Sequence, residues 1–122
     1  MDVSKILAAC DHTELSVSAS WEDVKAVLDD ALKYKTASAC IPPYFVKKAK
    51  AYVGDGLKIC TVIGFPNGYN ATAVKVFEAQ DALAAGADEL DTVINIGQLK
   101  AGNDKFVEEE IRRLKAVCGE KF

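Results

Sequence analysis

The sequence predicts an α/β fold in which a parallel sheet is covered by helices. One pattern recurs four times at intervals of roughly 25 to 30 residues: a short apolar run, a turn and an amphipathic stretch. The apolar runs are nearly continuous, which is typical of parallel strands buried on both faces. Parallel neighbours need crossover connections, and the amphipathic stretches are long enough to be those helices. We therefore expect residues 1–122 to form a single domain of four βα units.

Start and stop signals bound each of the four units. Ser20 and Asp23 form a capping box at the start of the first helix. The Pro42-Pro43 pair stops the second strand and presets the backbone for the helix that follows. Gly86 ends the third helix. The predicted strands cover 6–10, 37–41, 58–65 and 89–96, and the predicted helices cover about 20–35, 43–53, 71–85 and 104–117.

Four βα units are half of the eight that close a TIM (β/α)8 barrel, which takes about 250 residues. The same pattern also fits a small open, doubly wound sheet. The phosphate-binding fingerprint G-x-G-x-x-G that usually follows the first strand of such a sheet is absent from this sequence. The pattern therefore favours a parallel (βα)4 half of a TIM barrel over the open sheet.

Composition and charge argue against several classes of partner. The net charge is −3, with 15 basic and 18 acidic residues mixed along the chain, so no basic surface exists to bind nucleic acid. The longest apolar runs have the length of a strand, which excludes an integral membrane protein. No secretory signal is visible, so we expect a cytoplasmic location. The four cysteines form no zinc-binding spacing, and we expect them to be reduced and mostly buried.

Asp91 is the least expected residue within the predicted strands. It lies in the run Leu90–Ile94, where a strand buried on both faces should be apolar. Period-two alternation puts Asp91 and Val93 on one face and Leu90 on the other. If the Leu90 face packs against helices, Asp91 points into the barrel, where its pKa can be tuned for proton transfer. A structural salt bridge or a hydrogen-bonded core aspartate is the alternative interpretation.

Sites on α/β sheets assemble at the C-terminal ends of the strands, which draws attention to a few further residues. Asp11 and Thr13 follow the first predicted strand, although an aspartate that caps a loop is the common alternative. Cys40 ends the second predicted strand, where a packed, inert thiol is the alternative. Lys100 lies in a loop at the same end, but a lysine needs burial or a nearby cation to act as a nucleophile. The single histidine, His12, has no clustered partners and is assigned no role.

Several blocks of the sequence resemble the deoxyribose-phosphate aldolase family in order and spacing. The blocks are independent of one another and span essentially the whole chain, so the resemblance does not rest on a single motif. They are Asp11-His12-Thr13, Ala37-Ser38-Ala39-Cys40, Thr61-Val62-Ile63-Gly64-Phe65-Pro66, Glu78-Ala79, Gly86-Ala87-Asp88-Glu89-Leu90-Asp91 and Val93-Ile94-Asn95-Ile96-Gly97.

The resemblance implies a TIM barrel that reversibly cleaves 2-deoxy-D-ribose 5-phosphate to acetaldehyde and D-glyceraldehyde 3-phosphate, a lyase reaction of deoxyribonucleotide catabolism. The family works through a lysine Schiff base and uses neither a metal nor an organic cofactor, so we expect no cofactor and no metal site. By position, Asp91 matches the proton donor and acceptor that serves the carbinolamine and the imine. Asp11, Thr13 and Cys40 match residues that line the pocket.

The Schiff-base lysine of the family has no counterpart in these 122 residues. In the family this lysine lies on strand six in a Lys-Thr-Ser-Thr-Gly-like motif, a second lysine lies on strand seven, and phosphate-binding loops follow strands seven and eight. The sequence therefore resembles the N-terminal half of the family, and we expect the chain by itself to be inactive. Two hypotheses remain open: an aldolase half that needs its C-terminal partner, and a non-catalytic, self-associating scaffold. A third and weaker idea makes Lys100 the nucleophile.

A half-barrel is not expected to remain monomeric. A sheet of four strands leaves an unpaired edge at each end, and its inner face is apolar. The simplest closed solution is a two-fold dimer in which each half completes the other. We therefore expect a homo-oligomer, most simply a homodimer.

Overall fold

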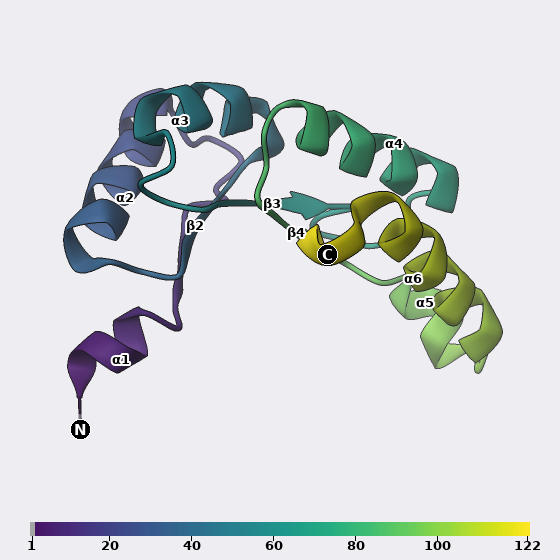
Figure 1. Cartoon of the computed structure of the whole chain (residues 1–122). Coiled ribbons are helices and arrows are strands. Elements are labelled where there is room, and N and C mark those ends of the chain that lie inside the picture. The colour runs from purple at the N-terminus through teal and green to yellow at the C-terminus, as the bar shows by residue number, and fades with distance from the viewer. Residues whose placement is uncertain (1) are drawn as a thin grey trace.

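The computed structural model describes residues 2–122, which form a four-stranded parallel sheet with the strand order β1-β2-β3-β4 (Figure 1). Each strand is therefore followed along the chain by its neighbour in space. The strands are β1 (Asp11–Thr13), β2 (Ser38–Ile41), β3 (Ile59–Ile63) and β4 (Glu89–Thr92). The helices are α1 (Val3–Leu7), α2 (Trp21–Tyr34), α3 (Val46–Val53), α4 (Thr72–Ala84), α5 (Ile96–Lys100) and α6 (Asp104–Cys118), with 3-10 turns at Pro43–Phe45 and Gly119–Lys121.

Helices cover one face of the sheet. Figure 1 shows α2, α3, α4 and α6 as an arc along that face. A doubly wound sheet would reverse its strand order and carry helices on both faces. The half-barrel prediction is therefore confirmed, and the open-sheet alternative is wrong. The core between the sheet and the helices includes Val24, Leu28, Ala39, Ile41, Ile59, Ile63, Ala79, Leu90 and Leu114.

The helices are amphipathic rather than uniformly apolar. The predicted capping box is present at the start of α2, where Ser20 and Asp23 bond to each other's backbone amides. Val24, Leu28 and Ala31 are the buried residues of α2, and their spacing of three and four residues places them on the face toward the sheet. Of the helices that the structure describes, none is long and apolar enough to cross a membrane.

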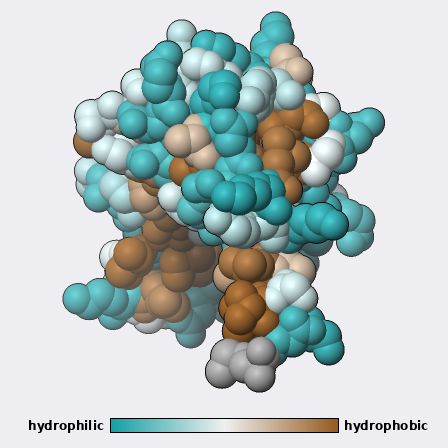
Figure 2. Space-filling view, turned by 90° about the vertical axis from the view of Figure 1, so that its left-hand side faces the viewer, coloured by the Kyte–Doolittle hydropathy of each residue, from teal (hydrophilic) through white to brown (hydrophobic). Residues whose placement is uncertain are grey.

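The sheet face without helices is the inner face of the half-barrel. Figure 2 shows apolar surface, in brown, gathered beneath the hydrophilic outer layer. Within residues 2–122, β1 and β4 each pair with one strand only, so the sheet has an unpaired edge at either end. Unpaired edges and an exposed apolar face are features that folded proteins normally cover.

The first predicted strand, 6–10, is wrong. Val3–Leu7 form the short helix α1, because the Asp2 carboxylate accepts a hydrogen bond from the Ser4 amide and caps a helix. Ile6 is 46% exposed, so this apolar run does not contribute a buried strand. The strand that pairs with β2 is instead Asp11–Thr13, the segment that the sequence placed after the first strand.

The fourth predicted strand, 89–96, is too long at its C-terminal end. β4 stops at Thr92, and Ile96 already begins α5. The Asn95 side chain accepts a hydrogen bond from the Gln98 amide at 3.1 Å, which starts that helix. Lys100 consequently ends a helix, where the sequence predicted a loop.

A buried ion pair joins α4 to α6 outside the sheet. Lys75 and Glu110 are 0% and 2% exposed, and the distance between Lys75 Nζ and Glu110 Oε1 is 2.6 Å. Lys75 Nζ also donates to the Val93 carbonyl at 2.8 Å, and the Thr72 hydroxyl donates to Glu110 Oε2 at 2.9 Å. These additional hydrogen bonds satisfy both charges, so the pair fixes the two helices against the segment that follows β4.

A second ion pair, between Lys50 and Asp88, fixes the start of β4. Asp88 accepts from Lys50 Nζ at 2.7 Å and from the Ile59 amide at 2.9 Å. Partial burial alone would raise the pKa of Asp88, but the two donors outweigh it and hold this pKa below its ordinary value. A carboxyl group with a lowered pKa stabilises the fold above its unfolded-state pKa of about 3.9, and this stabilisation is lost as the pH falls through the folded-state pKa.

Replacing Asp88 with asparagine should therefore lower the free energy of unfolding by about 1 to 2 kcal/mol at pH 7. Below about pH 4 the difference from the unmodified chain should shrink, because the carboxyl group becomes protonated there. Urea unfolding at pH 7 and at pH 3 measures both values. Asp55→Asn, at an exposed turn position, is the matched control and should change little at either pH. An equal loss at both pH values for Asp88→Asn would contradict the assignment.

Candidate active site

A cavity of about 330 Å³ opens on the inner face of the sheet near the C-terminal ends of the strands. All four residues that the resemblance assigned to the site line it, although they come from three different strands. The lining residues are Asp11, Thr13, Leu15, Cys40, Val62, Phe65, Asp91, Thr92 and Val93. The structure therefore brings these four residues into one cavity, whereas the sequence could assign each of them only to its own strand.

β4 delivers Asp91 to this cavity by simple alternation. Leu90 is 3% exposed and packs in the core between sheet and helices, so Asp91 must face the other way. In the strand register Asp91 is the partner of Val62 on β3, which also faces the cavity. Within residues 2–122, no hydrogen bond or ion pair engages the Asp91 carboxylate. The salt-bridge and core-hydrogen-bond interpretations of Asp91 are thus not realised in this chain.

β1 and β2 supply the opposite side of the cavity. Asp11 accepts a hydrogen bond from the buried Ser38 hydroxyl at 2.6 Å, which fixes its carboxylate against β2. The Thr13 hydroxyl donates to the Asp11 carbonyl at 2.9 Å. Asp11 and Thr13 lie within β1, and the Asp11 side chain bonds across strands. The alternative in which Asp11 caps a loop is therefore wrong.

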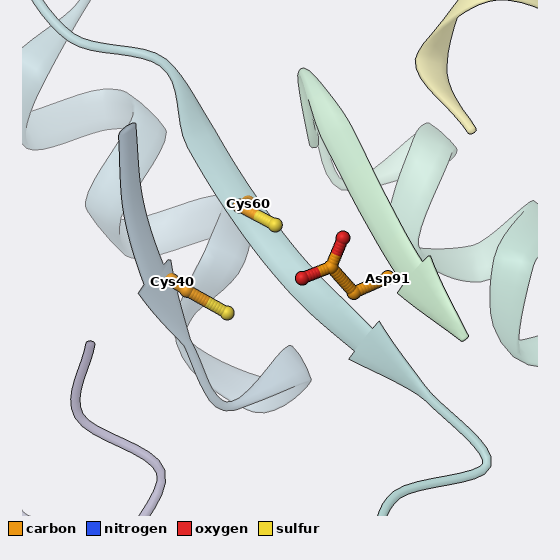
Figure 3. Close-up of side chains that lie close together, drawn as sticks. All are labelled: Cys40, Cys60 and Asp91. Atoms are coloured by element: carbon orange, nitrogen blue, oxygen red, sulfur yellow. The ribbon is translucent and has the colours of Figure 1, made fainter. Parts of the chain in front are cut away.

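Two thiols, those of Cys40 and Cys60, lie side by side below Asp91. The two residues are register partners on β2 and β3, and Figure 3 shows both sulfur atoms on the same face of the sheet as the Asp91 carboxylate. The Cys60 thiol donates to the Thr61 carbonyl at 3.8 Å, and the contact between the two thiols lowers the pKa of Cys40 below its ordinary value. The same contact, together with burial, raises the pKa of Cys60.

The loop after β3 forms the rim of the cavity and depends on two glycines. Gly64 and Gly68 have φ values of 63° and 72°, in the left-handed region. The Gly64 amide donates to Glu78 of α4 at 2.9 Å, which ties the loop to that helix. A Cβ on Gly68 would lie 2.1 Å from the Ile94 carbonyl oxygen, so only glycine allows the loop to lie against the end of β4. This packing holds Phe65 at the mouth of the cavity.

No lysine lines the cavity in the part of the chain that the structure describes. Lys100 is the nucleophile in the third hypothesis drawn from the sequence. Its side chain is exposed at the end of α5. Lys75 is buried on the helix side of the sheet, where Glu110 engages it. His12 faces α2, with its Nε2 atom 3.9 Å from the Asp30 carboxylate. The site therefore offers carboxylates and thiols but no amine.

A larger cavity of about 590 Å³ lies beside the first and shares Leu15, Val62 and Phe65 with it. Its lining is mostly apolar. Glu78 is the one carboxylate among its described lining residues, and the Gly64 amide already engages that side chain. The residues that the resemblance assigned to the site therefore line the smaller cavity, not the larger one.

Comparison with known families supports the resemblance read from the sequence. A model of the DeoC/LacD aldolase family matches residues 5–121, which is nearly the whole chain. The chain belongs to the DeoC/LacD aldolase family. Deoxyribose-phosphate aldolases from Streptococcus agalactiae and Streptococcus pyogenes are each 58% identical to it over 118 residues, covering 97% of this chain and 53% of theirs. The chain thus spans about half the length of these curated aldolase relatives.

Solved structures give the same picture of the fold. A protein from Coccidioides immitis superposes with a TM-score of 0.91 at 34% identity, covering 97% of this chain and 47% of that protein. A deoxyribose phosphate aldolase from Aeropyrum pernix, described as a tetramer, superposes with a TM-score of 0.75 at 32% identity, covering 89% and 50% of the two chains. The four βα units therefore match about half of each aldolase-family structure.

Proposed function

We propose that this chain forms the acid/base half of a class I deoxyribose-phosphate aldolase. The observation that carries the proposal is the position of Asp91, a carboxylate without a protein partner within residues 2–122, in a cavity at the C-terminal ends of barrel strands. Barrel enzymes place their chemistry at this end. Asp91 also stands in the sequence block that matches the acid/base residue of the family.

In this proposal Asp91 moves protons for an imine formed on a lysine outside the 122 residues. As an acid it protonates the carbinolamine hydroxyl, which leaves as water. As a base it accepts a proton from the substrate hydroxyl when the carbon–carbon bond of 2-deoxy-D-ribose 5-phosphate breaks. Asp11, Thr13 and Cys40 shape the pocket and provide hydrogen-bonding groups around the reacting carbon atoms.

The charge of the cavity supports a role in proton transfer rather than in phosphate binding. Its lining contains the carboxylates of Asp11 and Asp91 and, among the described residues, no basic side chain. Such a surface repels a phosphate group but accommodates an uncharged aldehyde carbon chain. We therefore assign the phosphate of the substrate to the remaining half of the barrel, together with the imine-forming lysine.

Activity should consequently require two halves. The 122-residue chain alone is expected to cleave no 2-deoxy-D-ribose 5-phosphate above background. Mixing it with a separately produced C-terminal half of the Streptococcus agalactiae relative should restore release of D-glyceraldehyde 3-phosphate, measured by a coupled NADH assay. The matched control is the same half mixed with bovine serum albumin. Cleavage by the 122-residue chain alone would overturn the division proposed here.

Without a complementing half, we propose that the chain associates with a second copy through the open inner face and the edges at β1 and β4. Each of these strands has one paired neighbour in the described residues. Light scattering of the isolated chain should give the mass of a dimer, and addition of the complementing half should replace it with a one-to-one complex. A monomer that stays soluble at high concentration would contradict this proposal. The free thiols of the chain suit the reducing cytoplasm, where we place it.

A further inference from the structure

The concave face of the sheet carries a compact set of potential metal ligands. One sulfur atom from each of Cys40 and Cys60 and one carboxylate oxygen of Asp91 all lie within 4.8 Å of one another. The three residues come from β2, β3 and β4, and Figure 3 shows the Asp91 carboxylate leaning over β3 toward the two thiols. From this geometry we infer that Cys40, Cys60 and Asp91 form a binding site for a thiophilic divalent cation of the zinc type.

The strand register explains how these ligands come together. Cys40 and Cys60 are direct partners across β2 and β3, so their side chains leave the sheet next to each other. Asp91 is the partner of Val62, two residues further along β3 than Cys60. The side chains at 60 and 62 face the same way, which places the carboxylate diagonally above the thiols.

The donor set selects the class of metal. Two thiolates and one carboxylate suit zinc, whereas magnesium and calcium require oxygen ligands throughout. In a tetrahedral zinc site the ligand atoms lie about 3.5 to 3.8 Å apart. The observed ligand atoms, within 4.8 Å of one another, would have to move closer together to bind zinc in this geometry. Three protein ligands leave a fourth position, and the cavity lined by Cys40 and Asp91 gives water access to it.

The surroundings within the 122-residue chain keep these ligands available. The Asp91 carboxylate has no hydrogen bond or ion pair within residues 2–122, so in the isolated chain a metal would not have to displace a protein cation from it. The thiols are 3% and 1% exposed, which shields a bound metal from bulk water on the side of the sheet. Binding converts both thiols to thiolates and releases two protons to the buffer.

Occupancy would have a consequence for the proposed reaction. A metal on Asp91 would hold the carboxylate that is proposed to transfer protons, so the metal would oppose the aldolase reaction rather than assist it. The binding site itself does not depend on the proposed function. Its test is therefore a direct measurement of binding to the 122-residue chain.

The test uses Co²⁺ as a spectroscopic substitute for zinc, added to the reduced, metal-free chain. Thiolate ligation should produce a near-ultraviolet charge-transfer band that saturates at one Co²⁺ per chain and disappears when Zn²⁺ is added. Cys60→Ser should weaken Zn²⁺ affinity, measured by calorimetry, by at least about ten-fold, and Asp91→Asn should weaken it by a similar factor. Asp81→Asn, an exposed aspartate on α4 outside both cavities, is the matched control and should leave the affinity unchanged.

A second variant keeps the test independent of any folding defect in Cys60→Ser. Replacing Cys10 and Cys118 together with serine leaves only the two proposed ligands as thiols. This double variant should retain the full charge-transfer band. Absence of the band in the unmodified chain, or its loss in the Cys10/Cys118 double variant, would overturn the site.

Discussion

Replacing Lys75 with methionine should destabilise the chain by about 3 to 5 kcal/mol. The substitution leaves the Glu110 carboxylate, which is 2% exposed, without its countercharge in the interior. It also removes the donor to the Val93 carbonyl, at the end of the segment that carries Asp91. Since small domains are stable by about 5 to 15 kcal/mol, this loss is a large fraction of the total. Urea unfolding followed by circular dichroism measures it.

Two further variants separate the buried charge from the loss of packing. Lys75→Met combined with Glu110→Leu removes both charges and should recover most of the stability, because no unpaired ion remains inside. Lys25→Met breaks the exposed pair with Asp29, whose side chains are 44% and 46% exposed, and should cost less than about 1 kcal/mol. A Lys75→Met chain as stable as Lys25→Met would show that the buried pair does not hold α4 and α6 together.

Replacing Asp91 with asparagine should lower the turnover of the reconstituted aldolase by about 100-fold to 10,000-fold. Asparagine keeps the shape of the side chain but cannot donate or accept the proton. The change should therefore appear mainly in kcat, with a smaller effect on KM. The assay is the coupled release of D-glyceraldehyde 3-phosphate by the variant chain mixed with the complementing half.

The control for this variant is Asp81→Asn, which changes an exposed aspartate on α4 outside both cavities. It should reconstitute with unchanged turnover. Light scattering must show that Asp91→Asn still binds the complementing half, so that a loss of turnover reports chemistry rather than assembly. Turnover of Asp91→Asn within a factor of a few of the unmodified mixture would contradict the acid/base assignment.

Much of the fold follows from local patterns in the sequence. Nearly continuous apolar runs separated by amphipathic stretches predicted four parallel strands with crossover helices, and the structure confirms this arrangement. Alternation around Leu90 predicted the face on which Asp91 lies. The apolar run at 6–10 misled the prediction because its composition fits a strand, whereas the Asp2 cap and the lack of a covering layer make it a helix. Whether this run is buried decides between strand and helix, and burial depends on the whole fold rather than on the local sequence.

The features that the sequence did not predict all depend on contacts between distant elements. Cys60 reads as an ordinary apolar residue of a buried strand, and only the register with Cys40 reveals a thiol pair. Lys75 reads as a surface lysine on a helix, since Glu110 is 35 positions away. Asp11, Thr13 and Cys40 were found because each follows or ends a predicted strand, a rule that holds for any parallel sheet, and Asp91 was found because it is a carboxylate inside an apolar strand. Their roles still rest on the family resemblance.

The central claim is that this chain supplies the acid/base carboxylate while the imine-forming lysine lies in the other half of the barrel. Borohydride reduction of the two-half mixture in the presence of acetaldehyde, followed by mass spectrometry of each chain, tests it most directly. The account predicts a single reduced adduct on the complementing half and none on the 122-residue chain. An adduct on the 122-residue chain, for example at Lys100, would contradict it.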